Sequence, residues 1–146
     1  MSFKSNLINI VLVETSHPGN IGSVARAMKT MGLSNLSLVN PRKFPSGEAN
    51  ALSGNAGDVL ENAQIFNSIE DAIKDSTFVY ATSSRSRTIQ WPTVHAEEGA
   101  LLINDQVTSD KKVSILFGRE DRGLTNEELQ LANTHIEIPA NPEYPV

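Results

Sequence analysis

Two polar side chains stand six residues apart near the start of the chain, in a stretch that is otherwise apolar or small. Asn20 opens this stretch, and Arg26 is the only charged residue between Ile21 and Met28. The interior of a helix has no packing need for an arginine, whereas a guanidinium group binds phosphates and developing anions strongly. The lone charge of Arg26 therefore indicates a bound ligand, and the alternative is a structural ion pair, with Glu120 as the candidate partner of Arg26.

A second group of charged residues lies between two glycines. Gly118 and Gly123 bracket the sequence Arg-Glu-Asp-Arg, directly after an apolar run. Glycine permits unusual backbone angles and the close approach of a ligand, so this turn is a candidate site loop. The alternative is a surface loop in which Glu120 forms local ion pairs with Arg119 and Arg122.

Hydroxyl groups and arginines also follow another apolar run, Phe78–Ala81. These polar residues are Thr82, Ser83, Ser84, Arg85 and Arg87, and the only tryptophan of the chain comes soon after them, at Trp91. Arginines beside an aromatic ring can hold phosphates and stack a base, as in RNA-binding proteins. The alternative is a flexible polar loop that Trp91 anchors to the core.

Short apolar runs, typical of strands, precede each of these groups. The runs are Ile8–Val13, Leu36–Val39, Phe78–Ala81, Val113–Phe117 and Ile136–Ile138, with a weaker one at Ala63–Phe66. Helical patterns lie between them, and strands that alternate with helices favour a mostly parallel α/β sheet with helices on both faces. The carboxyl ends of such strands are where open α/β sheets bind ligands.

Capping residues predict where several helices begin and end. We expect Asn20 to cap the first helix and Gly32 to end it in a left-handed conformation, with an apolar stripe that reaches Met31. Ser68 indicates the start of a helix at Ile69–Lys74, and residues 94–104 have a helical pattern. Thr125 and Glu128 have the spacing of a capping box.

Composition narrows the class of protein. The chain has 146 residues, no cysteine and a net charge of −5, which suits one globular domain without disulfides or thiolate chemistry. The acidic balance argues against a broad phosphate-binding surface, but the arginines lie mostly after predicted strands, which allows a local basic rim. No apolar run has the length of a membrane span and no signal peptide is recognisable, so we expect a cytoplasmic protein.

Several common chemistries have no motif in the sequence. The glycine spacing after Gly19 does not match a dinucleotide-binding fingerprint, and no phosphate-binding loop ends in Gly-Lys-Ser/Thr. The three histidines lack the spacing of metal ligands, so no metal site is expected. A small-molecule nucleotide enzyme of the doubly wound type is therefore disfavoured.

Three ordered segments together resemble the SpoU branch of the SPOUT superfamily, the RNA ribose methyltransferases with a trefoil knot. Asn20 to Arg26 resembles the first motif of that family, and Leu116 to Leu124 resembles the second. Ile136 to Pro139, with Asn141 to Tyr144, resembles the approach to the third. The resemblance spans nearly the whole chain, and it is closest to members that methylate nucleotide 32 in the tRNA anticodon loop.

The resemblance implies S-adenosylmethionine as the methyl donor, tRNA as the substrate and a homodimer with the first helix near its interface. The implied catalytic residues are Arg26, Asn20 and Glu120. The implied cofactor-binding residues are Thr82, Ser83, Ser84, Gly118, Ile138, Pro145 and Val146. Candidate RNA-binding residues are Arg85, Arg87, Trp91, Arg119 and Arg122.

The last expectations concern the end of the catalytic domain and two alternative functions. Residues 1–146 are expected to be a catalytic domain that stops before the asparagine and the knot-forming helix of the third motif. One alternative function is a tRNA-binding module without catalysis, which would keep Arg85, Arg87 and Trp91 but bind no cofactor. Another is a related enzyme of the same branch that acts on ribosomal RNA.

Overall fold

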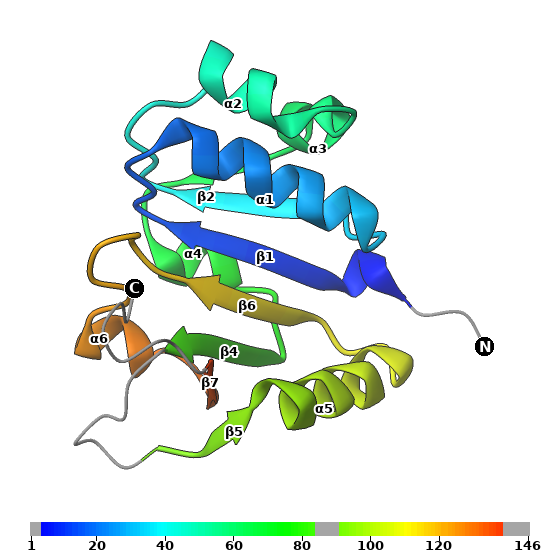
Figure 1. Ribbon diagram of the computed structural model, residues 1–146. Helices are drawn as coiled ribbons and strands as arrows, with labels where there is room; N and C mark the ends of the chain where they lie inside the picture. Colours follow the sequence, from blue (N-terminus) through cyan, green and yellow to red (C-terminus); the bar gives the residue numbers. More distant parts are fainter. Residues whose placement is uncertain (1–3, 84–90, 139–146) are drawn as a thin grey trace.

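The computed structural model describes residues 4–83 and 91–138, in which one parallel sheet forms the centre (Figure 1). The strand order is β3-β2-β1-β6-β4-β7-β5, and every neighbouring pair is parallel. The strands are β1 (Ile8–Val13), β2 (Asn35–Val39), β3 (Gln64–Phe66), β4 (Phe78–Ser83), β5 (Thr93–His95), β6 (Val113–Phe117) and β7 (Thr134–Glu137). Since all strands run the same way, their carboxyl ends share one edge of the sheet.

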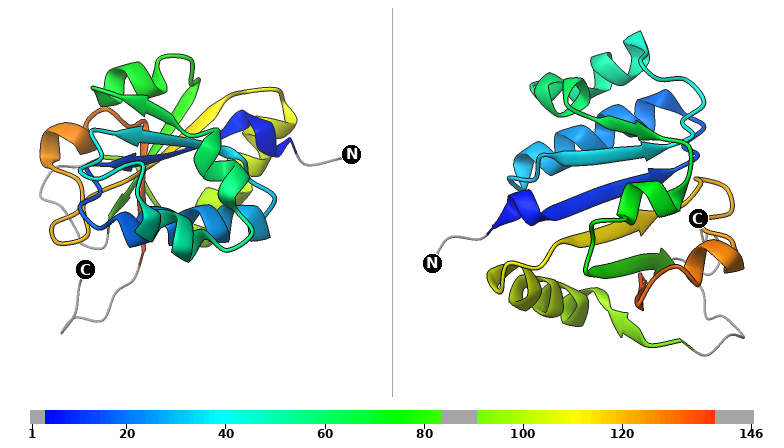
Figure 2. Two further views of the ribbon diagram at one scale, coloured as in Figure 1. Left: turned by 90° about the horizontal axis from the view of Figure 1, so that it is seen from above. Right: turned by 180° about the vertical axis from the view of Figure 1, so that it is seen from behind.

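Helices cover both faces of the sheet, but unevenly (Figure 2). The helices are α1 (Pro18–Thr30), α2 (Gly47–Ser53), α3 (Gly57–Glu61), α4 (Ile69–Ile73), α5 (Ala96–Thr108) and α6 (Asn126–Leu129), and a short 3-10 turn, Ser5–Leu7, precedes β1. Helices α1 and α5 pack on one face, with α2 and α3 against α1. The short helices α4 and α6 cover the other face.

The alternation of side chains along β1 shows why both faces must be covered. Ile8, Ile10 and Leu12 are buried in the core on the α1 side, whereas Val11 and Val13 are buried on the α4 side. A strand that is apolar on both faces is typical of a parallel sheet between two helical layers. The predicted α/β fold with a mostly parallel sheet and helices on both faces is therefore confirmed.

The first helix begins earlier than predicted. It starts at Pro18, with His17 in the cap position and no side-chain capping bond, so the prediction that Asn20 caps it was wrong. Proline suits the first helical turn because its missing N–H has no partner there in any case. Gly32 has a φ of +75° and follows the helix end, as predicted. Met31, expected in the apolar stripe, is 64% exposed.

Other boundaries also differ from the sequence prediction. Thr93–His95 forms the edge strand β5, and α5 begins only after it, whereas a helix was predicted from Val94. The last strand begins two residues earlier and ends one residue earlier than predicted, and α2 and α3 were not predicted. The capping box of Thr125 with Glu128 and the cap at Ser68 are confirmed. No helix in residues 4–83 or 91–138 is long and apolar enough to cross a bilayer.

Candidate active site at the carboxyl ends of the strands

Two polar bridges join the loop after β1 to the loop after β6. In the first, the backbone amide of Ser16 donates to Glu120 Oε2 at 3.1 Å, and the Ser16 hydroxyl donates to the same oxygen. In the second, Arg119 Nη2 donates to Glu14 Oε2 at 2.5 Å. These bridges join residues more than 100 positions apart in the sequence, so the two motif-bearing loops form one unit.

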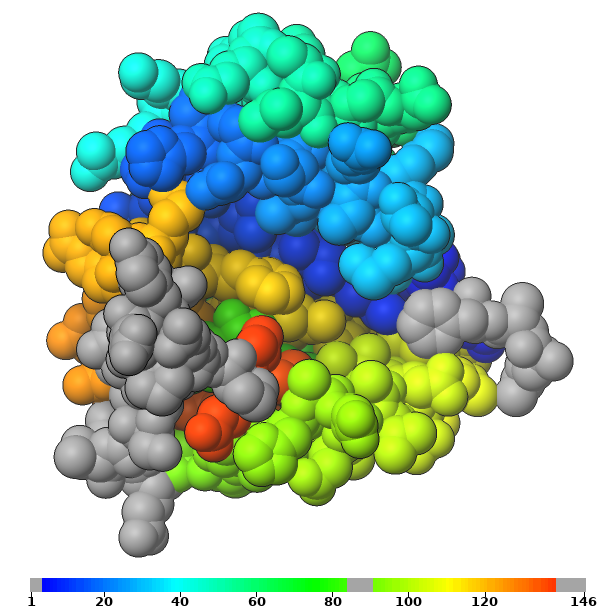
Figure 3. Space-filling model, in the orientation of Figure 1, coloured from blue at the N-terminus to red at the C-terminus, as the bar shows by residue number. Residues whose placement is uncertain are grey.

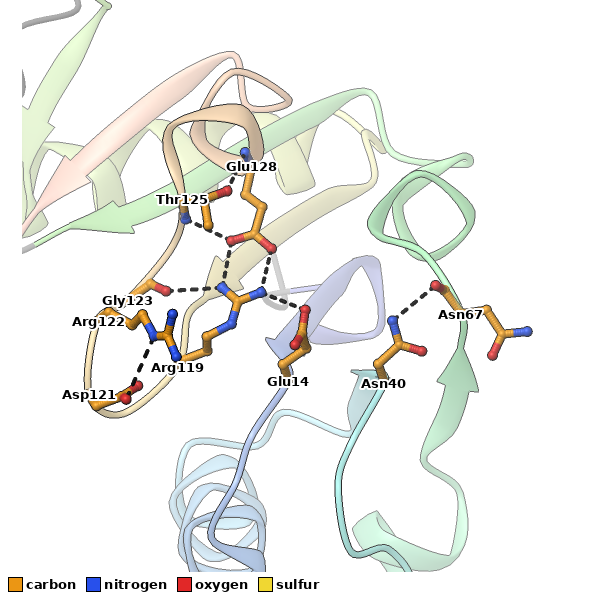
Figure 4. A network of polar contacts seen from close by, with 9 residues as sticks. All are labelled: Glu14, Asn40, Asn67, Arg119, Asp121, Arg122, Gly123, Thr125 and Glu128. Atoms are coloured by element: carbon orange, nitrogen blue, oxygen red, sulfur yellow. Dashed lines mark hydrogen bonds and ion pairs between the residues drawn. The ribbon is translucent and has the colours of Figure 1, made fainter.

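Arg119 is the centre of a larger polar network (Figure 4). Its two terminal nitrogens donate to Glu128 Oε1 at 2.8 Å and to Oε2 at 3.0 Å, in the two-pronged geometry that arginine favours. Glu128 Oε1 also accepts from the Thr125 amide at 2.7 Å, which completes the capping box of α6. The Arg119 side chain is only 15% exposed. Arg119 therefore holds Glu14, the 119–123 turn and the start of α6 together.

The network also determines the charge state of Glu128. Burial opposes ionisation of its carboxyl group, but the hydrogen bonds from Arg119 and from the Thr125 amide outweigh burial and hold its pKa below the ordinary value of 4.5. The same hydrogen bond to Glu128, with the one to Glu14, raises the pKa of the Arg119 guanidinium. Both groups are charged at neutral pH.

We expect Arg119→Ala to lower the free energy of unfolding by about 2 kcal/mol, because it leaves two carboxylates without their cation. Arg122→Ala is the control, since the Arg122 side chain is 73% exposed and should change stability little. A lowered pKa in the folded state stabilises the fold above pH 4.5, and this contribution disappears as the pH falls through the folded-state value. The free energy of unfolding, measured with urea, should therefore fall less between pH 7 and pH 3 in Arg119→Ala than in the wild type. Equal losses would contradict this role.

A cavity of about 330 Å³ opens between α1 and the β1–β6 part of the sheet, on the face shown in Figure 3. Its lining residues are Ile10, Leu12, Thr15, Asn20, Val24, Ala27, Met28, Met31, Leu33, Phe117, Gly118 and Glu120. Most of the wall is apolar, and the polar residues lie where β1 and β6 end. Three predicted site residues, Asn20, Gly118 and Glu120, thus meet at one cavity.

Arg26 lies on another side of α1. It follows Gly22 by one helical turn, is exposed, and has its Cδ atom near Gly54, at the end of α2. Among the described residues it forms no ion pair, so the alternative of a structural pair with Glu120 is wrong. An exposed guanidinium without a carboxylate partner is free to bind an anion from outside the chain.

The predicted cofactor residues that the structure describes lie on neighbouring strands. Thr82 and Ser83 end β4, Gly118 follows β6, and Ile138 follows β7. The amide of Ile138 donates to the Ser83 carbonyl at 2.8 Å, and the Thr82 hydroxyl donates to the Leu116 carbonyl at 2.9 Å. Ser84, Pro145 and Val146 lie outside the described residues. The others are close enough to serve one ligand, and their role in cofactor binding stays a prediction.

The predicted RNA contacts differ in their surroundings. Trp91 donates its indole N–H to the Ala132 carbonyl at 2.7 Å and stacks on His135 with ring centres 5.9 Å apart. These contacts agree with the alternative in which Trp91 is an anchor to the core. Arg119 has its partners inside the protein, and Arg122 is exposed. Arg85 and Arg87 lie outside the described residues. Contact of any of these residues with RNA stays a prediction.

Glu14, Thr15 and Ser16 are site residues that the sequence analysis did not identify. Glu14 directly follows β1 and has a φ of +51°, a left-handed conformation that is unusual for a residue with a side chain. The available signal was their position between the first apolar run and Asn20, at a predicted strand end. In residues 4–83 and 91–138, no three potential metal-ligating side chains lie together.

Comparison with known proteins gives a consistent assignment. Residues 7–146 match the model of the SpoU rRNA Methylase family. Over 137 residues the chain is 52% identical to the tRNA (cytidine/uridine-2'-O-)-methyltransferase TrmJ of Sodalis glossinidius, and this match covers 94% of the chain and 53% of that protein. The chain thus spans about half the length of the curated relatives it matches.

Solved structures agree with this match. TrmJ from Z. mobilis ZM4 superposes with a TM-score of 0.88 at 39% identity, covering 93% of this chain and 60% of that one. The SpoU methyltransferase AviRb from Streptomyces viridochromogenes, solved in complex with AdoMet, shares only the fold at 17% identity, with a TM-score of 0.68 over 97% of this chain and 53% of its own. On its sequence and its fold, this chain belongs to the SpoU methylase family.

Proposed function

We propose that the chain is the methyltransferase domain of an enzyme that methylates a ribose 2'-hydroxyl in tRNA, at nucleotide 32 of the anticodon loop. The observation that carries this proposal is that Asn20, Gly118 and Glu120 meet at one cavity in a chain that is 52% identical to a tRNA 2'-O-methyltransferase. The family description refers to rRNA, but the relatives at about 52% identity are named for tRNA. Modification of tRNA would place the enzyme in the cytoplasm.

The residues at the strand ends suit S-adenosylmethionine. Gly118 offers backbone groups where β6 ends, beside Ser83 at the end of the neighbouring strand β4, and Ile138 offers an apolar side chain that is 42% exposed. A ligand with a polar ribose, an apolar adenine face and a methionine tail needs both kinds of contact. When bound, this cofactor supplies a methyl group made electrophilic by the sulfonium.

The protein has to position a weak nucleophile and accept the charge that develops on it. Arginine stays protonated in ordinary settings, and Arg26 lies outside the cavity, so Arg26 is proposed to bind the phosphate beside the target nucleotide rather than to remove a proton. The proton then leaves the 2'-hydroxyl through phosphate or water. Asn20 contacts the ribose, and Glu120 keeps the two motif-bearing loops in place through Ser16.

A homodimer is part of the same proposal. Met31 at the end of α1 is 64% exposed, and Leu101 on α5 is 69% exposed, so both apolar side chains are accessible to a partner. A second copy that covers α1 would bury Met31 and close the open side of the cavity.

We expect the intact protein to bind S-adenosylhomocysteine in calorimetry and to methylate unmodified tRNA in the presence of S-adenosylmethionine. Mass spectrometry of nuclease digests should place the new 2'-O-methyl group at nucleotide 32. Ribosomal RNA fragments are the matched control substrate. Binding of tRNA without binding of S-adenosylhomocysteine would instead support the non-catalytic module, and methylation of the rRNA control alone would support the rRNA enzyme.

A further inference from the structure

Thr15 carries a buried hydroxyl group that the fold does not use. The residue is 4% exposed, and its carbonyl accepts from the Arg42 amide at 3.3 Å, but its hydroxyl has no hydrogen-bond partner among the described residues. A buried polar group without a partner lowers stability, so its presence needs an explanation.

The other buried serine and threonine residues of the described chain all have partners. The Ser37 hydroxyl donates to Asn9 at 2.6 Å, Ser53 donates to the Asn50 carbonyl at 2.8 Å, and the Ser114 hydroxyl lies 2.6 Å from that of Ser76. Thr15 is thus the exception within residues 4–83 and 91–138, and it is also the one of these residues that lines the α1–β6 cavity.

The surroundings of Thr15 define what could satisfy it. Asn20 and Glu120 line the same cavity, and Ser16 occupies only the Oε2 atom of the Glu120 carboxylate. A hydroxyl, a carboxamide and a carboxylate together offer both donors and acceptors to a ligand that carries neighbouring hydroxyl groups. The carboxylate disfavours a phosphate at this position, because two negative charges would lie side by side. The apolar walls, such as Leu12 and Phe117, strengthen hydrogen bonds by limiting water.

We propose that Thr15 is a substrate-binding residue, whose hydroxyl hydrogen bonds with the ribose of the target nucleotide beside Asn20 and Glu120. This inference rests on the proposed function, because it takes a ribose as the ligand of the cavity. It adds a specificity-determining group: a nucleotide without ribose hydroxyls leaves Thr15 unpaired. The hydroxyl is kept at the expense of stability, because it is satisfied only when RNA is bound.

Two substitutions at Thr15 separate binding from folding. Thr15→Val keeps the shape but removes the hydroxyl, so it should raise the melting temperature by about 2–4 °C while kcat/KM for tRNA falls about 10- to 100-fold. Thr15→Ser keeps the hydroxyl but removes a buried methyl group, so it should lower the melting temperature while kcat/KM stays within about threefold of wild type. A purely structural role cannot move the two quantities in opposite directions.

The experiment uses the intact protein, with methyl transfer to unmodified tRNA, calorimetry with S-adenosylhomocysteine and thermal melting. Cofactor binding should be unchanged in both variants. Ser53→Ala, which removes a buried hydroxyl that has a partner, is the control and should not raise the melting temperature or change kcat/KM. Wild-type activity in Thr15→Val, or loss of activity together with a lower melting temperature, would overturn the role of Thr15. If the wild type itself neither binds the cofactor nor methylates RNA, the proposed function fails instead.

Discussion

Replacing Arg26 with alanine is expected to abolish ribose methylation in the intact protein while folding and cofactor binding stay nearly unchanged. Arg26 is exposed on α1 and makes no ion pair within the described part of the chain. Replacing it with alanine therefore breaks no ion pair among those residues. By analogy with the removal of one preorganised donor from an oxyanion site, loss of the phosphate contact of Arg26 should lower the rate by a factor of ~10²–10³. Methyl transfer to unmodified tRNA measures the effect.

Two further variants sharpen this test. Arg26→Lys should fail as well, because an ammonium group cannot reproduce the planar two-pronged contact of a guanidinium with a phosphate. Lys29→Ala is the matched control, since Lys29 lies one turn further along the same helix and pairs with Asp58 at the surface. It should leave methylation unchanged. An Arg26→Ala enzyme that works within threefold of wild type would refute the assignment, as would a variant that is inactive only because it has unfolded.

Gly22→Ala is expected to have the largest effect on stability, and the reason is the close contact between α1 and α2. A Cβ atom on Gly22 would lie 2.1 Å from the Ala49 carbonyl oxygen and 3.0 Å from its carbonyl carbon. Backbone atoms cannot turn aside as a side chain can, so α2 has to move. We expect a loss of about 3 kcal/mol, at the upper end of ordinary overpacking, and a melting temperature lower by roughly 6–12 °C.

The matched control is Gly47→Ala in α2 itself. No atom lies within 4 Å of a Cβ placed on Gly47, and no left-handed φ is required there. Alanine has a higher helix propensity than glycine, so this variant should be neutral or slightly stabilising. Thermal melting of both variants is the measurement. Equal melting temperatures for Gly22→Ala and Gly47→Ala would contradict the tight contact between α1 and α2. Because Arg26 lies one turn after Gly22, the Gly22 variant should also displace Arg26 relative to Gly54.

Elements with a strong apolar period could be predicted from the sequence, and elements defined by their neighbours could not. The alternation in β1 and β6 reflects burial between two helical layers, which any parallel sheet requires. The three residues of β5 have no such pattern, and only their pairing with β7 makes them a strand. Helices α2 and α3 consist largely of small and polar residues, and α2 owes its place to the glycines of α1.

Some features of the candidate site could likewise be predicted from the sequence, and others could not. The resemblance of two motifs to a known family was enough to select Asn20, Gly118 and Glu120, which share a cavity. Residue type and spacing could not show that Arg119 is neutralised by Glu14, because those residues lie 105 positions apart in the sequence. They also could not show that the Thr15 hydroxyl has no hydrogen-bond partner within residues 4–83 and 91–138, since a missing hydrogen bond is visible only in the folded structure.

The pairing of β1 with β6 in the middle of the sheet has a consequence for synthesis of the chain. Ile8 pairs with Val113, and the pair β1–β6 joins the half of the sheet with β2 and β3 to the half with β4, β7 and β5. At a translation rate of about 5–20 residues per second, β1 waits roughly 5–20 s for its central partner to emerge from the ribosome. During that time β1 can pair only with β2, although α1, α2, α3 and β3 are already available to pack around them, and one edge of β1 stays open. The nascent chain should therefore depend on chaperones until β6 arrives, and a ribosome stall before Val113 should leave β1 accessible to protease.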